Sequence, residues 1–398
     1  MIDILLTNGW LRTAYASLRN LTSQGLSVAV SDSRPFGISQ FSNKKIKKFI
    51  YADYVLDEDR FCEDILKICR QNEIKYILPA HNETEVLSRR LKQDYPELCR
   101  MIPHIDQINL FNNKKKSYDL ANSLGIDVPK RFNYECTATL KNALNNNPRE
   151  KYVIKLHKSN SSKGVFYGET VKEVLDTTSY LIKKFSLPIE RYPQVEEYVD
   201  GVGIGCSHLY WDGKKILNFG HERVVERIET GGTSTFRKYF HDYALNIASQ
   251  KILESVNYHG LAMVEFKYNK QTGQYWFIEV NPRMWGSMPF AISCGANFPY
   301  TAFSLCNDSN KAQKSIKNKI SKNKKGMWLL GHLITALNYL VKAKPRKFLY
   351  TLTEIKKADY FDDFYCDDFG AFVGQILGYA YNLLRSLFYD DKKQKHIG

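Results

Sequence analysis

The sequence predicts a mixed fold: a parallel α/β domain at the N-terminus, an α+β domain in the middle and a helical extension at the C-terminus. Three observations predict it. Strand-like and helix-like segments alternate up to about residue 110, hairpin patterns dominate from there to about residue 308, and two apolar helical segments follow a lysine-rich stretch. We therefore expect three units, at residues 1–110, 111–308 and 309–398. The 398 residues, of which 43% are apolar, are enough to build cores for all of them.

The N-terminal alternation begins with a βαβ unit. An apolar run at residues 2–6 ends in a turn, residues 11–25 have helical periodicity closed by Gly25, and residues 26–33 form a second strand pattern. A strand at 46–55, a helix at 61–74 and a strand at 75–85 continue it. Ligands of parallel sheets bind at the carboxyl ends of the strands. The polar residues expected at that edge are Asn8, Gly9, Asp32, His81, Asn82 and Glu83.

Two interpretations of this edge stay open. The polar residues either face a ligand, or they only terminate strands and cap helices. The Asn8-Gly9 turn does not have the G-x-G-x-x-G spacing, so the sequence does not indicate dinucleotide binding there.

Hairpins dominate the middle unit after a helix at residues 115–125, which Gly125 and Pro129 end. Residues 152–168 read as two strands joined by a Ser/Lys/Gly loop, and residues 193–201 as a strand running into a turn. Residues 208–225 form a hairpin through Asp212-Gly213. Residues 260–283 form another, which turns at Thr272-Gly273 and carries an acid on each strand.

The extension begins with a predicted linker that holds seven lysines between residues 311 and 325. Helices are expected at residues 327–341 and 369–388, separated by an acidic patch of Asp359, Asp362, Asp363, Asp367 and Asp368. Each helix is apolar but too short to span a bilayer comfortably. We expect them to pack on the core, and peripheral attachment to a membrane near a lipid-linked substrate is the alternative.

Composition limits the expected cellular location and the expected classes of binding partner. The chain has no apolar run of roughly 20 residues and no signal-peptide pattern, so we expect a cytoplasmic protein. Its eight scattered cysteines lack metal-ligand spacing and read as reduced thiols. The formal charge of +15 suits anionic partners, but it also fits a solvated lysine-rich surface. Basic and aromatic residues do not interleave as in nucleic-acid-binding proteins, so no nucleic-acid partner is predicted.

The hairpin at residues 260–283 carries the clearest chemistry. Nucleotide phosphates are held through metal ions, which need hard oxygen ligands on adjacent strands. Glu279 and Asn281 lie two residues apart and share a face, and the turn can bring Glu265 alongside them. Magnesium is the expected ion, and manganese is possible. Arg283 follows as a fixed cation beside the metal.

This hairpin resembles the metal-binding hairpin of the ATP-grasp superfamily, whose signature is a Glu on one strand and Glu-x-Asn-x-Arg on the next. Other landmarks follow in the family's order. Lys114 resembles the first nucleotide-binding lysine, with Asn113 where the family commonly has Asp, and Lys155 resembles the second. Ser161, Ser162 and Gly164 fall in the segment that matches the mobile loop over the phosphates.

Residues 195–201 resemble the strand that recognises adenine. The resemblance places Glu196 near the exocyclic amine and the backbone of Glu197 and Val199 at the ring edge. Many members have an acidic residue for the ribose shortly afterwards, whereas this chain has GVGIG, so no ribose ligand is assigned. Arg223 matches a basic residue on the substrate side.

The resemblance covers about residues 1–305 and is closest to carbamoyl-phosphate-synthase-like, predicted carboxylate-amine ligases. It implies a pre-ATP-grasp α/β domain followed by a two-lobed ATP-grasp domain. It also implies ATP and Mg²⁺ as cofactors, and small-molecule carboxylate and amine substrates joined through an acyl phosphate. Arg283, helped by Arg223, would then stabilise charge on the transferring phosphoryl group. A homodimer is expected only because dimers are the commonest soluble assembly.

Plainer interpretations stand beside these roles. Lys114 lies in a run of three lysines and fits a surface residue as well. Lys155 lies between apolar strand residues and needs an anionic partner. Two acids on neighbouring strands repel unless a cation lies between them. Two other functions stay open: phosphorylation or carbamoylation of a small substrate, and a non-catalytic nucleotide-binding protein that docks on a membrane.

Overall fold

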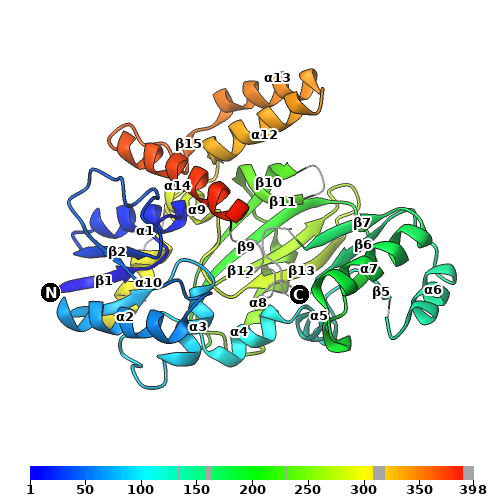
Figure 1. The fold of residues 1–398 in the computed structure, drawn as a ribbon, viewed down its shortest axis with the longest axis horizontal. Coiled ribbons are helices and arrows are strands. Elements are labelled where there is room, and N and C mark those ends of the chain that lie inside the picture. The colour runs from blue at the N-terminus through cyan, green and yellow to red at the C-terminus, as the bar shows by residue number, and fades with distance from the viewer. Residues whose placement is uncertain (133, 157–163, 229–230, 308–318, 389–398) are drawn as a thin grey trace.

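The computed structural model describes residues 1–132, 134–156, 164–228, 231–307 and 319–388. Their strands form a four-stranded, a seven-stranded and a second four-stranded sheet. The three sheets follow one another along the long axis of the molecule, and the C-terminal helices lie above the first two (Figure 1).

The N-terminal domain is a parallel α/β unit, as the alternating pattern predicts. Its strands pair in parallel in the order β3-β2-β1-β4. The central strands β1 and β2 are buried almost throughout, because parallel strands are covered on both faces. Its elements are β1 (Ile2–Leu6), α1 (Arg12–Thr22), β2 (Val28–Asp32), β3 (Lys47–Ile50), α2 (Glu58–Gln71), β4 (Ile74–Leu78) and α3 (Glu83–Arg90).

The smaller lobe of the middle unit is an antiparallel sheet in the order β5-β8-β6-β7. Helices α6 and α7 pack on it, and side chains from the strands and both helices form its own small core. Its elements, with the two helices that precede it, are α4 (Ile105–Asn112), α5 (Lys114–Ser123), β5 (Arg131–Phe132), α6 (Thr137–Asn145), β6 (Tyr152–Lys155), β7 (Val165–Gly168), α7 (Val171–Phe185), the 3₁₀ turn Ile189–Arg191 and β8 (Gln194–Glu197).

The larger lobe is built on the seven-stranded sheet β13-β12-β9-β10-β11-β14-β15. One face carries apolar side chains, such as Ile204 and Val264, that pack with α8 and α5 into a buried core. The opposite face joins a second core that includes side chains of α1, α9 and α10. The elements are β9 (Val202–Trp211), β10 (Lys214–Ile228), β11 (Gly231–Tyr239), α8 (Tyr243–Glu254), β12 (Gly260–Tyr268), β13 (Tyr275–Asn281), α9 (Met288–Ser293) and α10 (Phe298–Asn307).

The extension completes the central sheet and returns to the N-terminal domain. Its two short strands add to the sheet edge next to β11, so the last residues of the predicted linker, Lys325 and Gly326, form a strand instead. The rest of that linker up to residue 318 lies outside the described residues. The elements are β14 (Lys325–Met327), α12 (Leu329–Val341), α13 (Pro345–Glu354), the 3₁₀ turn Ile355–Lys357, β15 (Tyr360–Phe361) and α14 (Phe369–Phe388).

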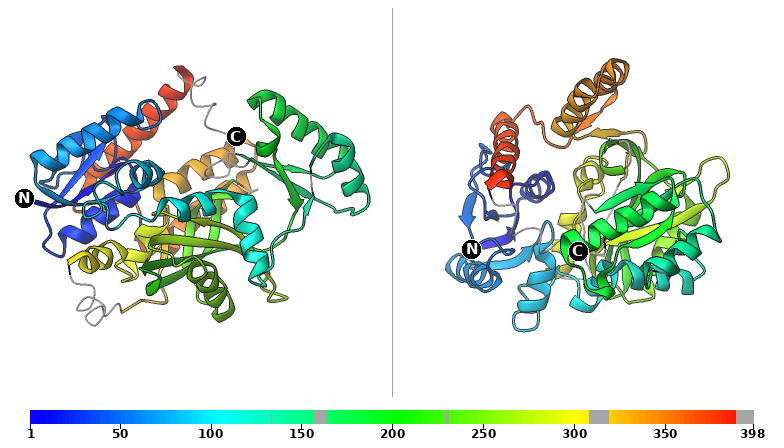
Figure 2. Two further views of the ribbon diagram at one scale, coloured as in Figure 1. Left: turned by 90° about the horizontal axis from the view of Figure 1, so that it is seen from below. Right: turned by 45° about the vertical axis from the view of Figure 1, so that its right-hand side comes forward.

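Helix α14 packs on the N-terminal domain, as expected for a helix covering the core. Tyr379 lies edge-on to Trp10, with 5.9 Å between ring centroids, and Arg385 pairs with Asp53 at 3.0 Å. The hairpin of α12 and α13, by contrast, contacts β10 and β11 through α12 and projects beyond the sheet in Figure 1 and in the right-hand view of Figure 2. Within the described residues, no helix combines the length and apolar character needed to cross a bilayer.

Candidate functional site

The hairpin of β12 and β13 brings the predicted metal ligands to one face. Glu265 pairs directly with Glu279, and Met263 pairs with Asn281. Directly paired residues of antiparallel strands point to the same side. The Asn281 amide nitrogen donates to a Glu265 carboxylate oxygen at 3.0 Å, so the Asn281 side-chain oxygen remains available to a cation. An arrangement on opposite faces would have excluded a shared cation, and the register excludes that arrangement.

Arg223 reaches this acidic pair by crossing a strand that carries glycine. It lies on β10, Glu265 lies on β12, and β9 runs between them. A Cβ added to Gly203 would lie 2.8 Å from Arg223 Cδ, and one added to Gly205 would lie 2.4 Å from the His221 ring. The bare backbone of β9 therefore leaves room for Arg223 to pair with both Glu265 and Glu226.

The pKa of Glu265 is strongly affected by its surroundings. Burial raises its pKa to about 7; Arg223 opposes the rise, and Glu279 and Glu226 add to it. The pKa of Arg223 is raised, because Glu265, Glu226 and Glu279 together outweigh the effect of its burial. Arg223 thus neutralises a group of acids that would otherwise repel one another.

The donor chemistry at this face fits Mg²⁺. Two carboxylates and an amide oxygen are hard ligands of the kind that Mg²⁺ takes, with its remaining positions filled by water and phosphate oxygens. Over the described part of the chain, no group of three or more His, Cys, Asp or Glu side chains converges as a complete metal cage. A cation here would therefore depend on the bound nucleotide for part of its coordination.

The second predicted cluster lies on β6, β8 and the start of α5. Lys155 Nζ forms an ion pair with Glu196 and lies 3.1 Å from the Tyr118 hydroxyl. Lys114 Nζ donates to the carbonyl of Leu156 at 2.9 Å. Lys114 is 8% exposed, which excludes the surface interpretation of its run of lysines. Asn113 caps α5 by accepting from the backbone N–H of Lys116, and an Asp at this position could form the same hydrogen bond.

Charge connects the two clusters. Burial lowers the pKa of Lys114, while the nearby Glu279 carboxylate acts in the opposite direction. Burial also acts to lower the pKa of Lys155, but Glu196 and Tyr118 outweigh it and the pKa is raised. Lys114, at the start of α5, therefore lies within electrostatic reach of both Lys155 in the smaller lobe and Glu279 in the central sheet.

The remaining nucleotide-side predictions have mixed outcomes. In this structure the Glu196 carboxylate is the partner of Lys155, and the Glu197 carboxylate accepts from Arg149 at 2.9 Å and from the N–H of Lys130. Val199 follows β8 and is half-buried, and Gly164 turns the chain into β7. Ser161 and Ser162 lie outside the described residues.

Arg283 faces the N-terminal domain. Its Nη1 donates to the carbonyl of Met284 at 3.0 Å, and burial lowers its pKa against the pull of Glu279 and Glu83. Burial, followed by the charges of Arg283 and Arg34, holds the pKa of His81 well below its usual value. Arg283, Arg34 and His81 therefore gather where the N-terminal domain meets the metal face.

The polar strand ends of the N-terminal domain divide between the two interpretations. Glu83 is fully buried and accepts from Thr7, Asn8 and the backbone N–H groups of Ala80 and His81, so it ties strand ends together. Asp32 likewise accepts from two backbone N–H groups at 2.8 Å. For Asn8, Asp32 and Glu83 the structural interpretation holds, whereas His81 lies toward Arg283.

Several residues of the site carry no pattern that sequence reasoning could use. Tyr118 contacts Lys155 from within a helix, and Glu226 pairs with Arg223. Arg34 stacks on Trp10 at 4.3 Å, and its Nε and Nη1 are buried without a hydrogen-bond partner among the described residues. Of these residues, Arg34 alone has a sequence position that could have indicated a role. It follows the carboxyl end of β2, where ligands of parallel sheets bind. His221 is structural, with Nε2 3.1 Å from Ser287 Oγ.

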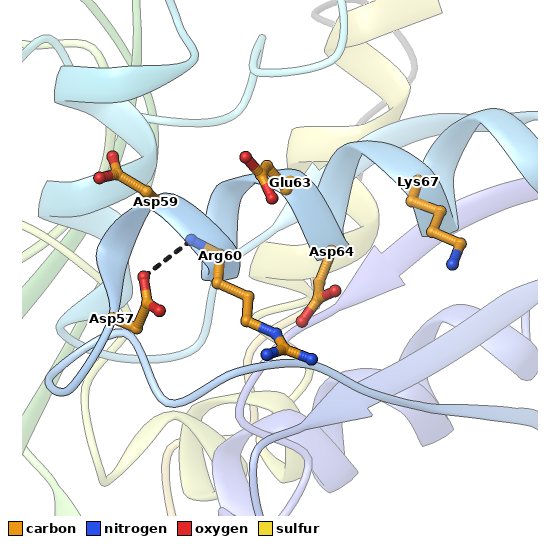
Figure 3. Close-up of a pocket in the computed structure, with 6 residues that line it drawn as sticks. All are labelled: Asp57, Asp59, Arg60, Glu63, Asp64 and Lys67. Carbon is orange, nitrogen blue, oxygen red and sulfur yellow. Dashed lines mark hydrogen bonds between the residues drawn. The ribbon is translucent and has the colours of Figure 1, made fainter.

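A hollow of about 630 Å³ lies elsewhere, along α2 of the N-terminal domain (Figure 3). Acidic and basic side chains alternate along it: Asp57, Asp59, Arg60, Glu63, Asp64 and Lys67. Asp57 caps the helix by accepting from the N–H of Arg60, and Asp64 accepts from the N–H of Ala52 at 2.8 Å. None of the predicted site residues lines this hollow, and its carboxylates serve the local fold.

Sequence comparisons match parts of the chain. Residues 195–325 match the profile of a family described as ATP-grasp in the biosynthetic pathway with Ter operon. Acetyl-CoA carboxylases 2 and 1 of Arabidopsis thaliana are each 36% identical over 66 residues. That match covers 16% of this chain and only 2% and 3% of the two carboxylases.

Comparison with solved structures extends over most of the chain. Biotin carboxylase of Campylobacter jejuni, described as a complex with β-γ-ATP, has a TM-score of 0.63 at 13% identity. The biotin carboxylase domain of Hydrogenobacter thermophilus 2-oxoglutarate carboxylase, a dimer with MgADP and bicarbonate, has a TM-score of 0.65 at 14% identity. Each match covers 82% of this chain, and 74% and 73% of the respective carboxylase chains. Pyruvate carboxylase of Rhizobium etli matches with a TM-score of 0.61 and 16% identity, over 81% of this chain and 29% of its own.

Proposed function

Because the chain has the fold of the ATP-grasp superfamily, to which biotin carboxylase domains belong, we propose that it is an ATP-dependent ligase joining a small carboxylic acid to an amine. The proposal rests above all on the direct pairing of Glu265 with Glu279 beside Asn281. These donors on one face suit the Mg²⁺ that accompanies ATP. Assembly as a homodimer stays a prediction.

The nucleotide would lie between the two lobes. Lys155 and Lys114 would contact its phosphates, and Glu265, Glu279 and Asn281 would hold one or two Mg²⁺, which neutralise phosphate charge when bound. Glu196 and the backbone of Glu197 and Val199 would recognise adenine. In this arrangement a phosphate oxygen replaces Glu196 as the partner of Lys155, so Glu196 becomes free to accept from the adenine amine.

The reaction would proceed in two displacements. A carboxylate oxygen of the acid attacks the γ-phosphorus, the bond to the bridging oxygen breaks, and ADP leaves with that electron pair. An amine nitrogen then attacks the carbonyl carbon of the acyl phosphate and loses a proton, and inorganic phosphate leaves. Arg283 and Arg223 would stabilise the charge on the transferring group and on the tetrahedral intermediate. Side-chain nucleophiles are not required.

The acid would enter from the N-terminal domain. Arg283 borders the proposed metal face, and Arg34, whose charge also acts on His81, offers two buried nitrogens without a hydrogen-bond partner among the described residues. A planar guanidinium fork suits carboxylate. Two arginines and a neutral imidazole therefore favour an anionic acid at this edge.

The test is ADP release that requires Mg²⁺, an acid and an amine together. Asn281→Ala or Glu279→Gln should lower turnover by more than the roughly 10–100-fold typical of losing an outer-shell metal partner. Undiminished turnover in either variant would refute the assignment. Mg²⁺-dependent ATP binding without turnover, across a broad screen of acids and amines, would favour the non-catalytic alternative.

A second candidate reaction takes bicarbonate as the acid. It is favoured by the structural neighbours described as biotin carboxylases, one of them with bound bicarbonate. The product would then be a carboxylated or carbamoylated compound rather than an amide of an organic acid. Incubation with ¹³C-bicarbonate and ATP separates the two, since an amide ligase leaves no label in its product.

A further inference from the structure

The hairpin of α12 and α13 has its polar side turned inward. His332 on α12 is fully buried, with Nδ1 3.0 Å from Thr235 Oγ1 and Nε2 2.8 Å from the carbonyl of Thr351 on α13. Gly331, Thr335 and Ala336 are the other buried residues of α12. Small and polar side chains thus attach the hairpin to the central sheet, where a soluble helix normally places its apolar stripe.

The outward side is apolar. On α12, Leu337, Leu340 and Val341 are 56%, 50% and 86% exposed and recur at the spacing of one helical face. On α13, Leu349 and Tyr350 are each 60% exposed. All five residues belong to α12 and α13, the two helices whose hairpin projects from the molecule (Figure 1). Several large exposed apolar side chains on one projecting hairpin indicate a binding surface rather than scattered exposure.

Within residues 329–353, which include this apolar tip, every charged side chain is basic. Lys342, Lys344, Arg346 and Lys347 lie at the turn between the helices, and residues 329–353 contain no Asp or Glu. A helix with an apolar face and flanking cations is the pattern of helices that lie in the headgroup region of a bilayer. Basic residues beside such a face attract anionic lipids.

We propose that the tip formed by Leu337, Leu340, Val341, Leu349 and Tyr350 docks on the surface of a bilayer that contains anionic lipids. The charge pattern decides between occupants. A second copy of the hairpin would bring two basic turns together, and residues 329–353 supply no acid to pair them, whereas a nucleic acid would leave the leucines uncovered. The interface of an anionic bilayer accommodates both features, with aliphatic side chains below the headgroups and cations among the phosphates.

The docking is independent of the ligase reaction, so its test does not use catalysis. The full chain should float with vesicles of equal parts phosphatidylglycerol and phosphatidylcholine, and should stay unbound with phosphatidylcholine alone. Added salt should weaken the binding by screening the lysines and Arg346. Val341→Glu combined with Leu349→Glu should lower vesicle affinity about tenfold or more, since burying one aliphatic side chain is worth about that factor.

Matched variants separate this surface from general charge and hydrophobicity. Tyr243→Glu removes an equally exposed apolar residue, 76% exposed on α8, and should float like the unmodified chain. Lys342→Glu with Arg346→Glu should lose binding, whereas Lys141→Glu with Lys172→Glu, on exposed positions of the smaller lobe, should not.

A direct readout comes from Leu340→Trp, whose added fluorescence should be quenched by brominated lipids in the anionic vesicles. Three results would overturn the proposal: no flotation with anionic vesicles, equal flotation of the Val341→Glu/Leu349→Glu variant, or a dimer in sedimentation that this variant dissociates. The last result would make a second copy the occupant.

Discussion

At the scale of single residues, the site holds its charges in pairs that a ligand can replace. Glu265 is paired with Arg223, and Lys155 is paired with Glu196. All four side chains are buried or nearly so, and an unpaired charge there would be costly. A metal ion would replace Arg223 as the partner of Glu265, and a phosphate would replace Glu196 as the partner of Lys155.

Glu265 predicts how metal binding depends on pH. Because its pKa is raised to about 7, a proton competes with Mg²⁺ below that pH. Mg²⁺-dependent nucleotide binding should weaken about tenfold for each pH unit below about 7. Glu265→Gln should bind weakly at every pH and lose this slope. Titration calorimetry between pH 5 and 8 in steps of about one unit measures it.

The same pKa sets the sign of an effect on ligand-free stability. In the unfolded chain Glu265 ionises near its ordinary value of 4.5, so its contribution to stability is present below that pH and is lost as pH rises through about 7. Relative to the unmodified chain, Glu265→Gln should therefore be more stable in alkaline than in acidic buffer. A constant difference across this range would contradict the raised pKa.

Glu196→Ala tests whether a phosphate can replace the Glu196 carboxylate as the anionic partner of Lys155. Removal of one side of a buried pair typically costs about 3–5 kcal/mol, so the melting temperature of the ligand-free variant should fall. Tripolyphosphate with Mg²⁺, which lacks the adenine that Glu196 is proposed to recognise, should restore more stability to the variant than to the unmodified chain, because it supplies the missing anion. Glu197→Ala, at a partly exposed pair, is the control and should show little of either effect. Equal stabilisation of all three proteins would contradict phosphate binding by Lys155.

The sequence pointed to the charged residues of the site because they interrupt apolar strands. Lys155 lies between Ile154 and Leu156, and a lysine buried at such a position needs an anionic partner. The structure confirms that Lys155 is buried. Tyr118 and Glu226 gave no such signal, since a tyrosine in a helix and a glutamate in a strand occur in any protein. Their roles depend on distances that only the folded chain defines.

At the scale of elements, strand β9 shapes the site because its glycines have no side chains that would block Arg223. Gly203→Ala would place a Cβ 2.8 Å from Arg223 Cδ, and Arg223 is pinned by Glu265 and Glu226. We expect destabilisation of about 1–3 kcal/mol, as for overpacking, together with weaker Mg²⁺-dependent nucleotide binding.

The control is Gly9→Ala, where an added Cβ would meet nothing closer than 3.4 Å, so stability should change little. Chemical denaturation and calorimetry on both variants test this, and unchanged metal affinity in Gly203→Ala would mean that Arg223 can shift freely.

Hairpins and helices of ordinary length were predictable, whereas the shortest strands were not. The turn at Thr272-Gly273 between two strand-like segments rich in apolar and aromatic residues specifies the hairpin of β12 and β13 locally. Strands β14 and β15, of three and two residues, form only because the edge of β11 offers them partners. Such pairing is a property of the sheet and leaves no periodicity in the sequence.

At the scale of the whole molecule, a buried group of three charges joins the parts. Asp362 next to β15 accepts from Arg12 of α1 at 3.2 Å and from Arg237 of β11 at 2.6 Å, and both Asp362 and Arg237 are fully buried. Arg12 also donates to the carbonyl of Gly286, which follows the hairpin of β12 and β13. The N-terminal domain, the central sheet and the extension therefore share one electrostatic contact.

Asp362→Ala should leave two arginines buried without their acid. We expect a loss of about 3–5 kcal/mol in the free energy of unfolding. Asp367→Ala removes an acid that is 53% exposed and pairs with Arg19 and Lys44, so it should cost no more than about 1 kcal/mol. Urea denaturation of the two variants compares them directly, and equal losses would mean that the buried group contributes no more than a surface pair.

These long-range contacts explain why the sequence gives little information on how the extension is attached. The acidic patch at residues 359–368 reads as a solvated break between helices, yet Asp362, Asp363 and Asp368 are fully buried. Asp362 and Asp368 find partners more than 300 positions away, at Arg12, Tyr15 and Ser42, and Asp363 accepts from the backbone N–H groups of Leu329 and Leu330. Periodicity reports the face of an element, but not the element that will cover it.

The position of α14 has a consequence for the way the chain is made. Its Gly374 lies so close to the carbonyl of Gly37 that a Cβ would approach to 2.4 Å, so this helix closes on a loop near the start of the chain. During translation, residues 1–110 leave the ribosome long before residues 369–388 do. The surface around Trp10 that α14 covers then stays uncovered until α14 itself has been made. Nascent chains released early should thus be the ones that chaperones retain and proteases remove first.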